Sequence, residues 1–278
     1  MNVLELSALT GLTSLVAGFI GALTGLGGGV IIVPVLTLVF GIDIRYAIGA
    51  SLISVIATSS GAAAAYVKEG YTNLRIGMFL EIATTSGAIL GAFIAGYIST
   101  STVGLIFGLV LIYSGIMAWR PHPDRFLPVT PTRLTTTLKL SGILPTPDGV
   151  RPYVARRVPY GFALMAMAGA ISGLLGIGSG AFKVLAMDQM MRIPFKVSTT
   201  TSNFMIGVTA AASAGVYLSR GYIDPSLAAP VMLGVLIGSL VGARLLIRAP
   251  STALRKLFVG VILIMAFEMI YNSIAGRL

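Results

Sequence analysis

The chain alternates long apolar segments with short polar connections, and this pattern predicts membrane-spanning helices. The first apolar segment runs from about Leu6 to Phe40, which at about 1.5 Å per helical residue is too long for one crossing of a roughly 30 Å hydrocarbon core. A similar segment, from Tyr160 to Met191, opens the second half, and glycines interrupt both. Ordinary spans are predicted at Tyr46 to Val67, Leu74 to Tyr97, Thr102 to Trp119, Val197 to Leu218, Leu227 to Ile247 and Leu254 to Asn272.

The two glycine interruptions are copies of one another. A constant shift of 151 residues places Gly25 on Gly176, and the same register carries on to Ser51 on Ser202 and beyond. The sequence therefore predicts a first membrane repeat at residues 1–120, a linker at 121–159 and a second repeat at 160–278. Matched glycine breaks in two membrane repeats indicate a substrate site where the repeats meet.

Composition supports a membrane environment and excludes several other classes. Hydrophobic residues make up 56% of the chain and charged residues 10%, and the mean hydropathy is +0.94, values typical of a polytopic membrane protein. The net charge of +10 lies in the connections, where basic residues set orientation, so no nucleic-acid partner is expected. The absence of cysteine excludes disulfides and thiolate chemistry. No cofactor or metal site is expected, and the start lacks the basic region of a cleaved signal peptide.

Charge also selects a topology. By the positive-inside rule the linker is expected in the cytoplasm, because it carries Arg120, Arg125, Arg133, Lys139, Arg151, Arg156 and Arg157. If the second glycine-broken segment is a re-entrant hairpin, the basic cluster from Arg244 to Lys256 also lies inside, whereas a crossing segment would place that cluster outside. A hairpin plus three spans makes an odd number of crossings. The predicted fold class is thus an all-α polytopic membrane protein with two inverted repeats.

The linker is the one polar stretch. Its Thr-rich segment from Leu134 to Leu140 and the turn residues Pro147-Asp148-Gly149 indicate a small β-hairpin. A disordered tether is the alternative for such a short, Pro-rich stretch.

A helix that begins inside the membrane presents free N–H groups and a positive dipole end to an anion. The expected substrate-binding residues at the two breaks are Gly27, Gly28, Gly29, Gly178, Ser179 and Gly180, completed by hydroxyl or amide groups of Ser51, Ser202 and Asn203. The alternative is that the glycines only allow close helix packing and that the hydroxyls bond to helix backbone.

Ionisable groups inside spans are costly and are usually functional. Lys183 follows the second break and is expected to pair with a transported anion, or else to reach the headgroups or Asp188. Glu81 and Glu268 are candidate carriers of a coupling proton, unless each lies close enough to a membrane surface to be solvated.

The stretch GFIGALTGLGGGVIIVP from Gly18 to Pro34, together with Ala50-Ser51-Leu52 and the GAILGA stretch that starts at Gly87, resembles the TauE/SafE family of membrane permeases. The second copy departs from the pattern at Ser179 and Leu185. The resemblance implies a secondary transporter of small sulfur-containing or organic anions, such as sulfite or a sulfonate, in the bacterial inner membrane.

Two other functions compete with this interpretation. Half-helix termini also line passive anion channels, which single-channel current would distinguish from a saturable carrier. An intramembrane hydrolase would need a nucleophile and a base. With no cysteine and the only histidine, His122, in the linker, such an enzyme would depend on Ser179 and Lys183.

Overall fold

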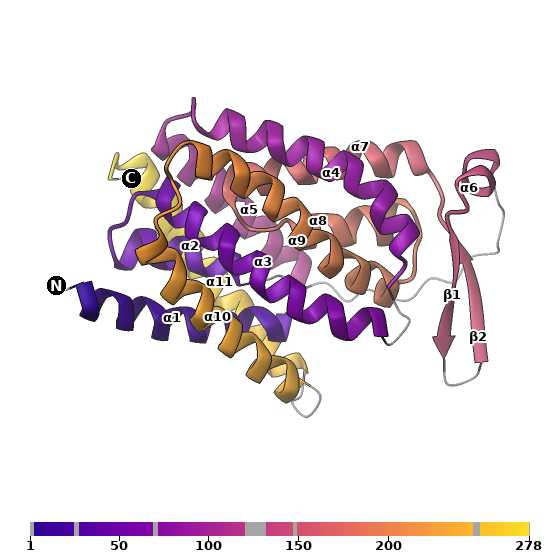
Figure 1. Cartoon of the computed structure of the whole chain (residues 1–278), viewed down its shortest axis with the longest axis horizontal. Coiled ribbons are helices and arrows are strands. Elements are labelled where there is room, and N and C mark those ends of the chain that lie inside the picture. The colour runs from indigo at the N-terminus through magenta and orange to yellow at the C-terminus, as the bar shows by residue number, and fades with distance from the viewer. Residues whose placement is uncertain are drawn as a thin grey trace.

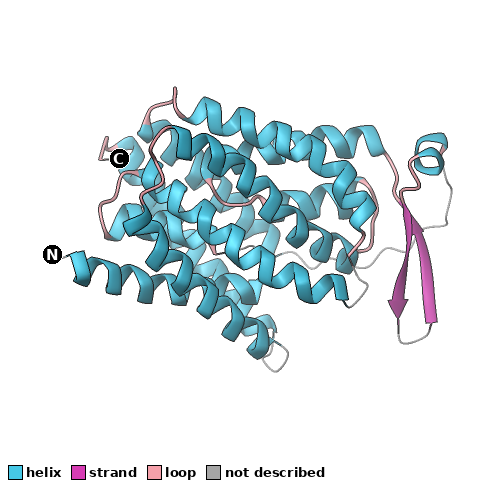
Figure 2. Cartoon of the chain, in the orientation of Figure 1, coloured by secondary structure: helices cyan, strands magenta, loops and turns pink. Residues whose placement is uncertain are grey.

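The computed structural model describes residues 3–24, 28–68, 72–119, 132–146, 149–246 and 251–277. Most of these residues are helical, and a two-stranded sheet projects from one end of the helical body (Figures 1 and 2). The prediction of a predominantly helical chain is confirmed. Among the described residues, α4 (Leu74–Ala95) and α7 (Val158–Leu175) are long and apolar enough to cross a membrane by length and composition.

The helices of the two halves follow the same order. In the first half they are α1 (Val3–Thr24), α2 (Gly29–Pro34) with its π-helical continuation η1 (Val35–Val39), α3 (Ile44–Lys68), α4 and α5 (Thr100–Trp119). In the second half they are α7, α8 (Gly180–Leu185) with η2 (Ala186–Met190), α9 (Phe195–Ser219), α10 (Pro225–Leu246) and α11 (Ser251–Ile274). Helices therefore cover the described parts of the predicted spans, except that α4 ends at Ala95, two residues before the predicted end at Tyr97.

Between the halves lie a short helix and an antiparallel hairpin. The helix is α6 (Arg133–Thr137), and the strands are β1 (Ser141–Thr146) and β2 (Gly149–Val154). Ser141 pairs with Val154 and Thr146 with Gly149. We call the end of the molecule that carries this hairpin the linker end, and the end where both chain termini lie the opposite end (Figure 1).

Each glycine-broken segment returns to the end where it began. The second starts beside the linker and comes back to it, because the N–H of Arg156 donates to the carbonyl of Met191 at 2.8 Å. The first starts and finishes at the opposite end, where residues of α1 and the connection before α3 line one cavity. The short helices α2 and α8 thus reverse the direction of the chain inside the helical body (Figure 1).

Glycines bring helices of different halves into backbone contact. A Cβ atom on Gly169 of α7 would overlap the backbone of Thr84 in α4, and one on Gly18 of α1 would overlap the backbone of Val235 in α10. The shift of 151 residues maps each of these contacts onto the other. Small residues at such crossings allow the close approach on which helix association in lipid depends.

We expect Gly169→Ala to destabilise the protein, because the added methyl group forces α4 and α7 apart. Overpacking of this kind costs about 1–3 kcal/mol. Gly215→Ala is the matched control, since nothing lies within 4 Å of a Cβ atom at that helical position. Thermal unfolding of the detergent-purified variants measures the difference. Equal melting temperatures for the two variants would show that the crossing tolerates separation.

Candidate functional site

The second glycine break is a run of left-handed backbone conformations. After α7 ends at Leu175, the φ angles are +68° at Gly176, +72° at Gly178 and +46° at Ser179. Glycine adopts such angles at little cost, whereas serine does so rarely. This sequence of angles stops α7 and redirects the chain into α8. The backbone carbonyl groups released by the break then need new hydrogen-bond donors.

The two breaks meet at α3. A Cβ atom on Gly29, the first residue of α2, would lie 2.6 Å from the hydroxyl oxygen of Ser51 and 3.0 Å from the carbonyl oxygen of Gly176. Any side chain at Gly29 would therefore separate the first break from the second. The sequence predicted that the two breaks share one site, and the structure places Gly29, Ser51 and Gly176 in contact.

Two of the predicted serines bond to the break itself. The Ser51 hydroxyl donates to the carbonyl of Gly176 at 2.9 Å, and the Ser202 hydroxyl of α9 donates to the carbonyl of Gly180 at 3.3 Å. A serine hydroxyl has one hydrogen to donate, so in this arrangement neither hydrogen is free for an anion. By contrast, the Ser179 hydroxyl is 2% exposed and has no hydrogen-bond partner within the described part of the chain.

A polar cluster of four side chains, Glu81, Thr85, Lys183 and Thr209, lies beyond the second break. We call it the charged cluster. Lys183 of α8 is fully buried, and its Nζ donates to the hydroxyl oxygen of Thr209 in α9. The same hydroxyl donates to Oε1 of Glu81 in α4, and Lys183 Nζ lies 3.9 Å from Oε2 of Glu81. Threonine thus bridges the ammonium and the carboxylate.

The two carboxylate oxygens of Glu81 differ in their surroundings. Oε1 accepts from Thr209 and, at 3.0 Å, from the Thr85 hydroxyl one turn along α4. Oε2 is buried, faces Lys183, and has no hydrogen-bond partner among the described residues. An unsatisfied buried oxygen is costly. It is also the oxygen at which a proton would disturb no existing hydrogen bond.

The remaining predicted residues lie elsewhere or contribute less. Gly27 falls outside the described residues, and Gly28 is buried ahead of α2. Asn203 is half-buried on α9 beside Ser202. Glu268 lies on the exposed face of α11, where the Asn272 side chain bonds to its backbone carbonyl at 2.9 Å.

The contact needed for a serine–lysine hydrolase is not formed. Lys183 donates to Thr209 and faces Glu81, while the Ser179 hydroxyl has no partner in the described part of the chain. A base that activates serine must lie within hydrogen-bond reach of it.

Sequence reasoning missed Thr85 and Thr209 as members of this cluster. The register of the repeats, which superimposes Thr58 on Thr209, was the available signal for Thr209. The sequence did not indicate that α4 of one half would lie against α8 and α9 of the other.

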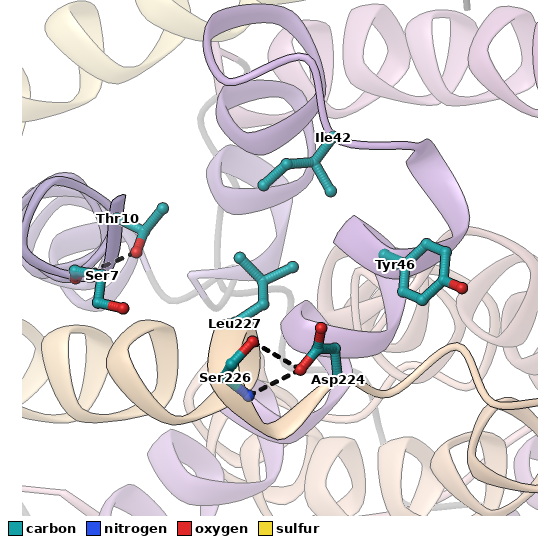
Figure 3. A pocket seen from close by; sticks show the side chains of 7 residues that line it. All are labelled: Ser7, Thr10, Ile42, Tyr46, Asp224, Ser226 and Leu227. Atoms are coloured by element: carbon teal, nitrogen blue, oxygen red, sulfur yellow. Dashed lines mark hydrogen bonds between the residues drawn. The ribbon is translucent and has the colours of Figure 1, made fainter. Parts of the chain in front are cut away.

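A cavity of about 290 Å³ opens at the opposite end. Figure 3 shows its lining, which comes from α1, from the connection before α3 and its first turn, and from the start of α10. The lining residues are Ser7, Thr10, Ile42, Tyr46, Asp224, Ser226 and Leu227. The Ser226 hydroxyl and backbone N–H both donate to Oδ1 of Asp224. These bonds hold the pKa of the Asp224 carboxyl below its usual value, so the cavity carries a fixed negative charge near neutral pH.

The charged cluster makes Lys183 and Glu81 interdependent. Lys183→Met alone leaves Glu81 buried without a cation, and breaking a buried pair in this way typically costs about 3–5 kcal/mol. The double variant Lys183→Met/Glu81→Gln removes both charges and should recover most of that loss. The test is thermal unfolding of Lys183→Met, of Glu81→Gln and of the double variant. Additive losses in the double variant would show that the two groups do not stabilise one another.

Comparison with known proteins identifies the family. The family model for the sulfite exporter TauE/SafE matches residues 10–269. The probable membrane transporter protein YunE of Bacillus subtilis is 26% identical over 270 residues, which cover 94% of this chain and 96% of the relative. The probable membrane transporter protein YdhB of the same organism is 27% identical over 252 residues, with 88% and 91% covered.

A third relative extends the comparison to another organism. A probable membrane transporter protein of Xylella fastidiosa is 26% identical over 267 residues, which cover 93% of each chain. No solved structure matches this chain. Because the family model spans nearly the whole sequence, the chain belongs to the TauE/SafE family of membrane transporter proteins.

Proposed function

We propose that this protein is a multi-pass secondary transporter of the bacterial inner membrane that moves a small sulfur-containing or organic anion, such as sulfite or a sulfonate, by alternating access. Membership of a membrane transporter family gives the transport role and the membrane location. The observation that carries the anion assignment is the fully buried ammonium of Lys183, held beside a break in the helices. The ammonium donates to the neutral Thr209 hydroxyl, and the Glu81 carboxylate lies 3.9 Å away, so an anion that accepts directly from the ammonium can compete with Glu81.

We further propose that the two halves are inverted repeats. The proposal is supported by the exchanged helix pairs, α1 with α10 and α7 with α4, whose glycine contacts map onto one another under the 151-residue shift. It is also supported by the return of each glycine-broken segment to its starting end. Each half then contributes three full crossings and one re-entrant segment, which gives the halves opposite orientations.

Charge at the two ends supports a cytoplasmic linker end. Basic residues dominate among the described residues there, namely Arg75, Arg133, Lys139, Arg151, Arg156, Arg157, Arg192 and Lys196. At the opposite end Arg45, Arg220 and Arg277 are accompanied by Glu5, Asp43 and Asp224. By the positive-inside rule, this distribution favours a linker end in the cytoplasm.

In the proposed mechanism the transported anion competes with Glu81 for Lys183. Without substrate, Glu81 neutralises the ammonium through Thr209 and across the 3.9 Å gap to Oε2. An arriving oxyanion would accept from Lys183 and from the Ser179 hydroxyl, which has no partner among the described residues, while the carbonyls at the break stay bonded to Ser51 and Ser202. Charge-assisted hydrogen bonds of this kind suit the oxygens of a sulfite or sulfonate.

Displacement of Glu81 also explains how a proton would be coupled. Once the anion holds Lys183, the Glu81 carboxylate is a buried charge without a cation, which is costly. Proton uptake at Oε2 removes that charge and keeps the charged cluster neutral overall. Anion binding and protonation of Glu81 would then occur together, so a pH gradient could drive accumulation of the anion.

Glu81→Gln tests this coupling, because the amide fills the same space but cannot exchange a proton. In proteoliposomes loaded with sulfite, we expect the variant to lose accumulation driven by a pH gradient and to keep anion exchange. Lys183→Met/Glu81→Gln should lose both activities, since the cation is also gone. Glu268→Gln is the matched control, because that carboxylate lies on the exposed face of α11. Unchanged pH-driven accumulation in Glu81→Gln would rule out this carrier, and single-channel current in the native protein would rule out alternating access.

The topology can be tested separately, because the chain contains no native cysteine. With an impermeant thiol reagent added outside intact cells, we expect Asp224→Cys to be labelled and Arg192→Cys to be protected until the membrane is permeabilised. Labelling of Arg192→Cys from outside would contradict the inverted arrangement.

A further inference from the structure

The cavity at the opposite end has a counterpart at the linker end. The shift of 151 residues that relates the two halves maps each residue of the cavity lining onto a residue close to the hairpin. The matched pairs are Ser7 with Val158, Thr10 with Gly161, Ile42 with Ile193, Tyr46 with Val197, Asp224 with Asn73, Ser226 with Arg75, and Leu227 with Ile76. The same architectural position thus occurs twice, once at each end.

The two positions differ in exposure. Tyr46 is 38% exposed in the cavity, while its counterpart Val197 is 1% exposed. Ile42 is half-buried, and its counterpart Ile193 is 1% exposed. Side chains from the linker pack at this position, because Leu140, Leu144, Tyr153 and Ala155 belong to the same apolar cluster as Ile76, Val158, Ile193 and Val197.

Hydrogen bonds fix the hairpin in this position. Asn73 caps α4, as its counterpart Asp224 precedes α10, but the Asn73 amide also donates to the carbonyl of Ser141 at 3.2 Å and to the phenol oxygen of Tyr153 at 2.9 Å. The backbone bond from Arg156 to Met191 ties the end of the hairpin to the chain that leaves η2. The hairpin is therefore held against the linker end of the helical body by both apolar and polar contacts.

The apolar cluster leads from the hairpin to the charged cluster. Leu80, a member of it, precedes Glu81 in α4. Met205, another member, lies one turn before Thr209 in α9, and its carbonyl oxygen is 2.9 Å from the Thr209 hydroxyl oxygen. Met187 lies one turn beyond Lys183. The apolar cluster thus extends from the hairpin to residues that adjoin the charged cluster.

We propose that the β1–β2 hairpin is a gate that closes the linker-end mouth of the transport path, with the cavity at the opposite end as the second mouth. The inference rests on the proposed alternating access. The structure then corresponds to a state that is open at the cavity and closed at the linker end. Release of Leu144 and Tyr153 from the apolar cluster would open a counterpart of the cavity above the charged cluster.

Cysteine accessibility tests the cover, and it does so without any substrate. Val197→Cys places the only thiol of the chain beneath the hairpin. We expect slow reaction with a maleimide from the linker side, and a rate about tenfold higher when Leu144→Ser is added, because local opening limits the reaction of a buried group. Ile143→Ser is the matched control, since Ile143 neighbours Leu144 on β1 but is 61% exposed, against 5% for Leu144. Equal labelling rates for Val197→Cys with Leu144→Ser and for Val197→Cys with Ile143→Ser would overturn the proposal.

A reversible cross-link tests the gating. In Asn73→Cys/Ser141→Cys, a reducible bifunctional thiol reagent ties the hairpin to α4, and we expect sulfite flux in proteoliposomes to fall to background and to recover on reduction. Full flux in the cross-linked protein would overturn the gate and leave the hairpin as a fixed cover. The proposed transport fails in a different way. If the native chain shows no sulfite flux while Leu144→Ser still speeds the labelling of Val197→Cys, the proposed transport is overturned and the cover over Val197 remains.

Discussion

The structure depends on the neutralisation of one buried positive charge. The Lys183 ammonium has no access to water, and an ion in such a place is tolerated only when other groups take over its solvation. Thr209 and Glu81 do so from α9 and α4. Three helices from both halves are therefore held in one arrangement around a single side chain. In the proposed mechanism, the substrate replaces Glu81 at Lys183. The same contact therefore stabilises the fold and binds the substrate.

The glycine breaks are a second constraint, and they act through the backbone. Breaking a helix inside an apolar body releases carbonyl groups that cannot bond to water. Ser51 and Ser202 supply hydrogens to the carbonyls of Gly176 and Gly180. These serines hold the breaks in shape, which leaves Ser179 as the hydroxyl without a described partner. The three serines that the sequence assigned to substrate binding thus differ, since Ser51 and Ser202 support the backbone and the Ser179 hydroxyl has no partner among the described residues.

The two halves have the same order of helices but differ in the side chains at the breaks. Lys183 corresponds to Ile32 and Ser179 to Gly28, so the described charged cluster draws its cation from the second half alone. The linker adds another difference, because side chains of its hairpin pack against the linker end of the helical body, whereas the cavity lies at the opposite end. In the proposed mechanism, a covered linker end and an open cavity at the opposite end make up one of the states between which alternating access switches.

The sequence by itself determined the repeats, the helices and the positions of the breaks, because hydrophobic periodicity, glycine and charge act locally along the chain. It also singled out Lys183 and Glu81, since charges within apolar segments are conspicuous. It could not show that these two residues meet, because they lie on helices about a hundred residues apart whose packing depends on glycine crossings between the halves. Only the tertiary structure joined Lys183, Thr209 and Glu81, committed Ser51 and Ser202 to backbone carbonyls, and seated the hairpin on the helical body, because each of these contacts depends on how distant segments pack.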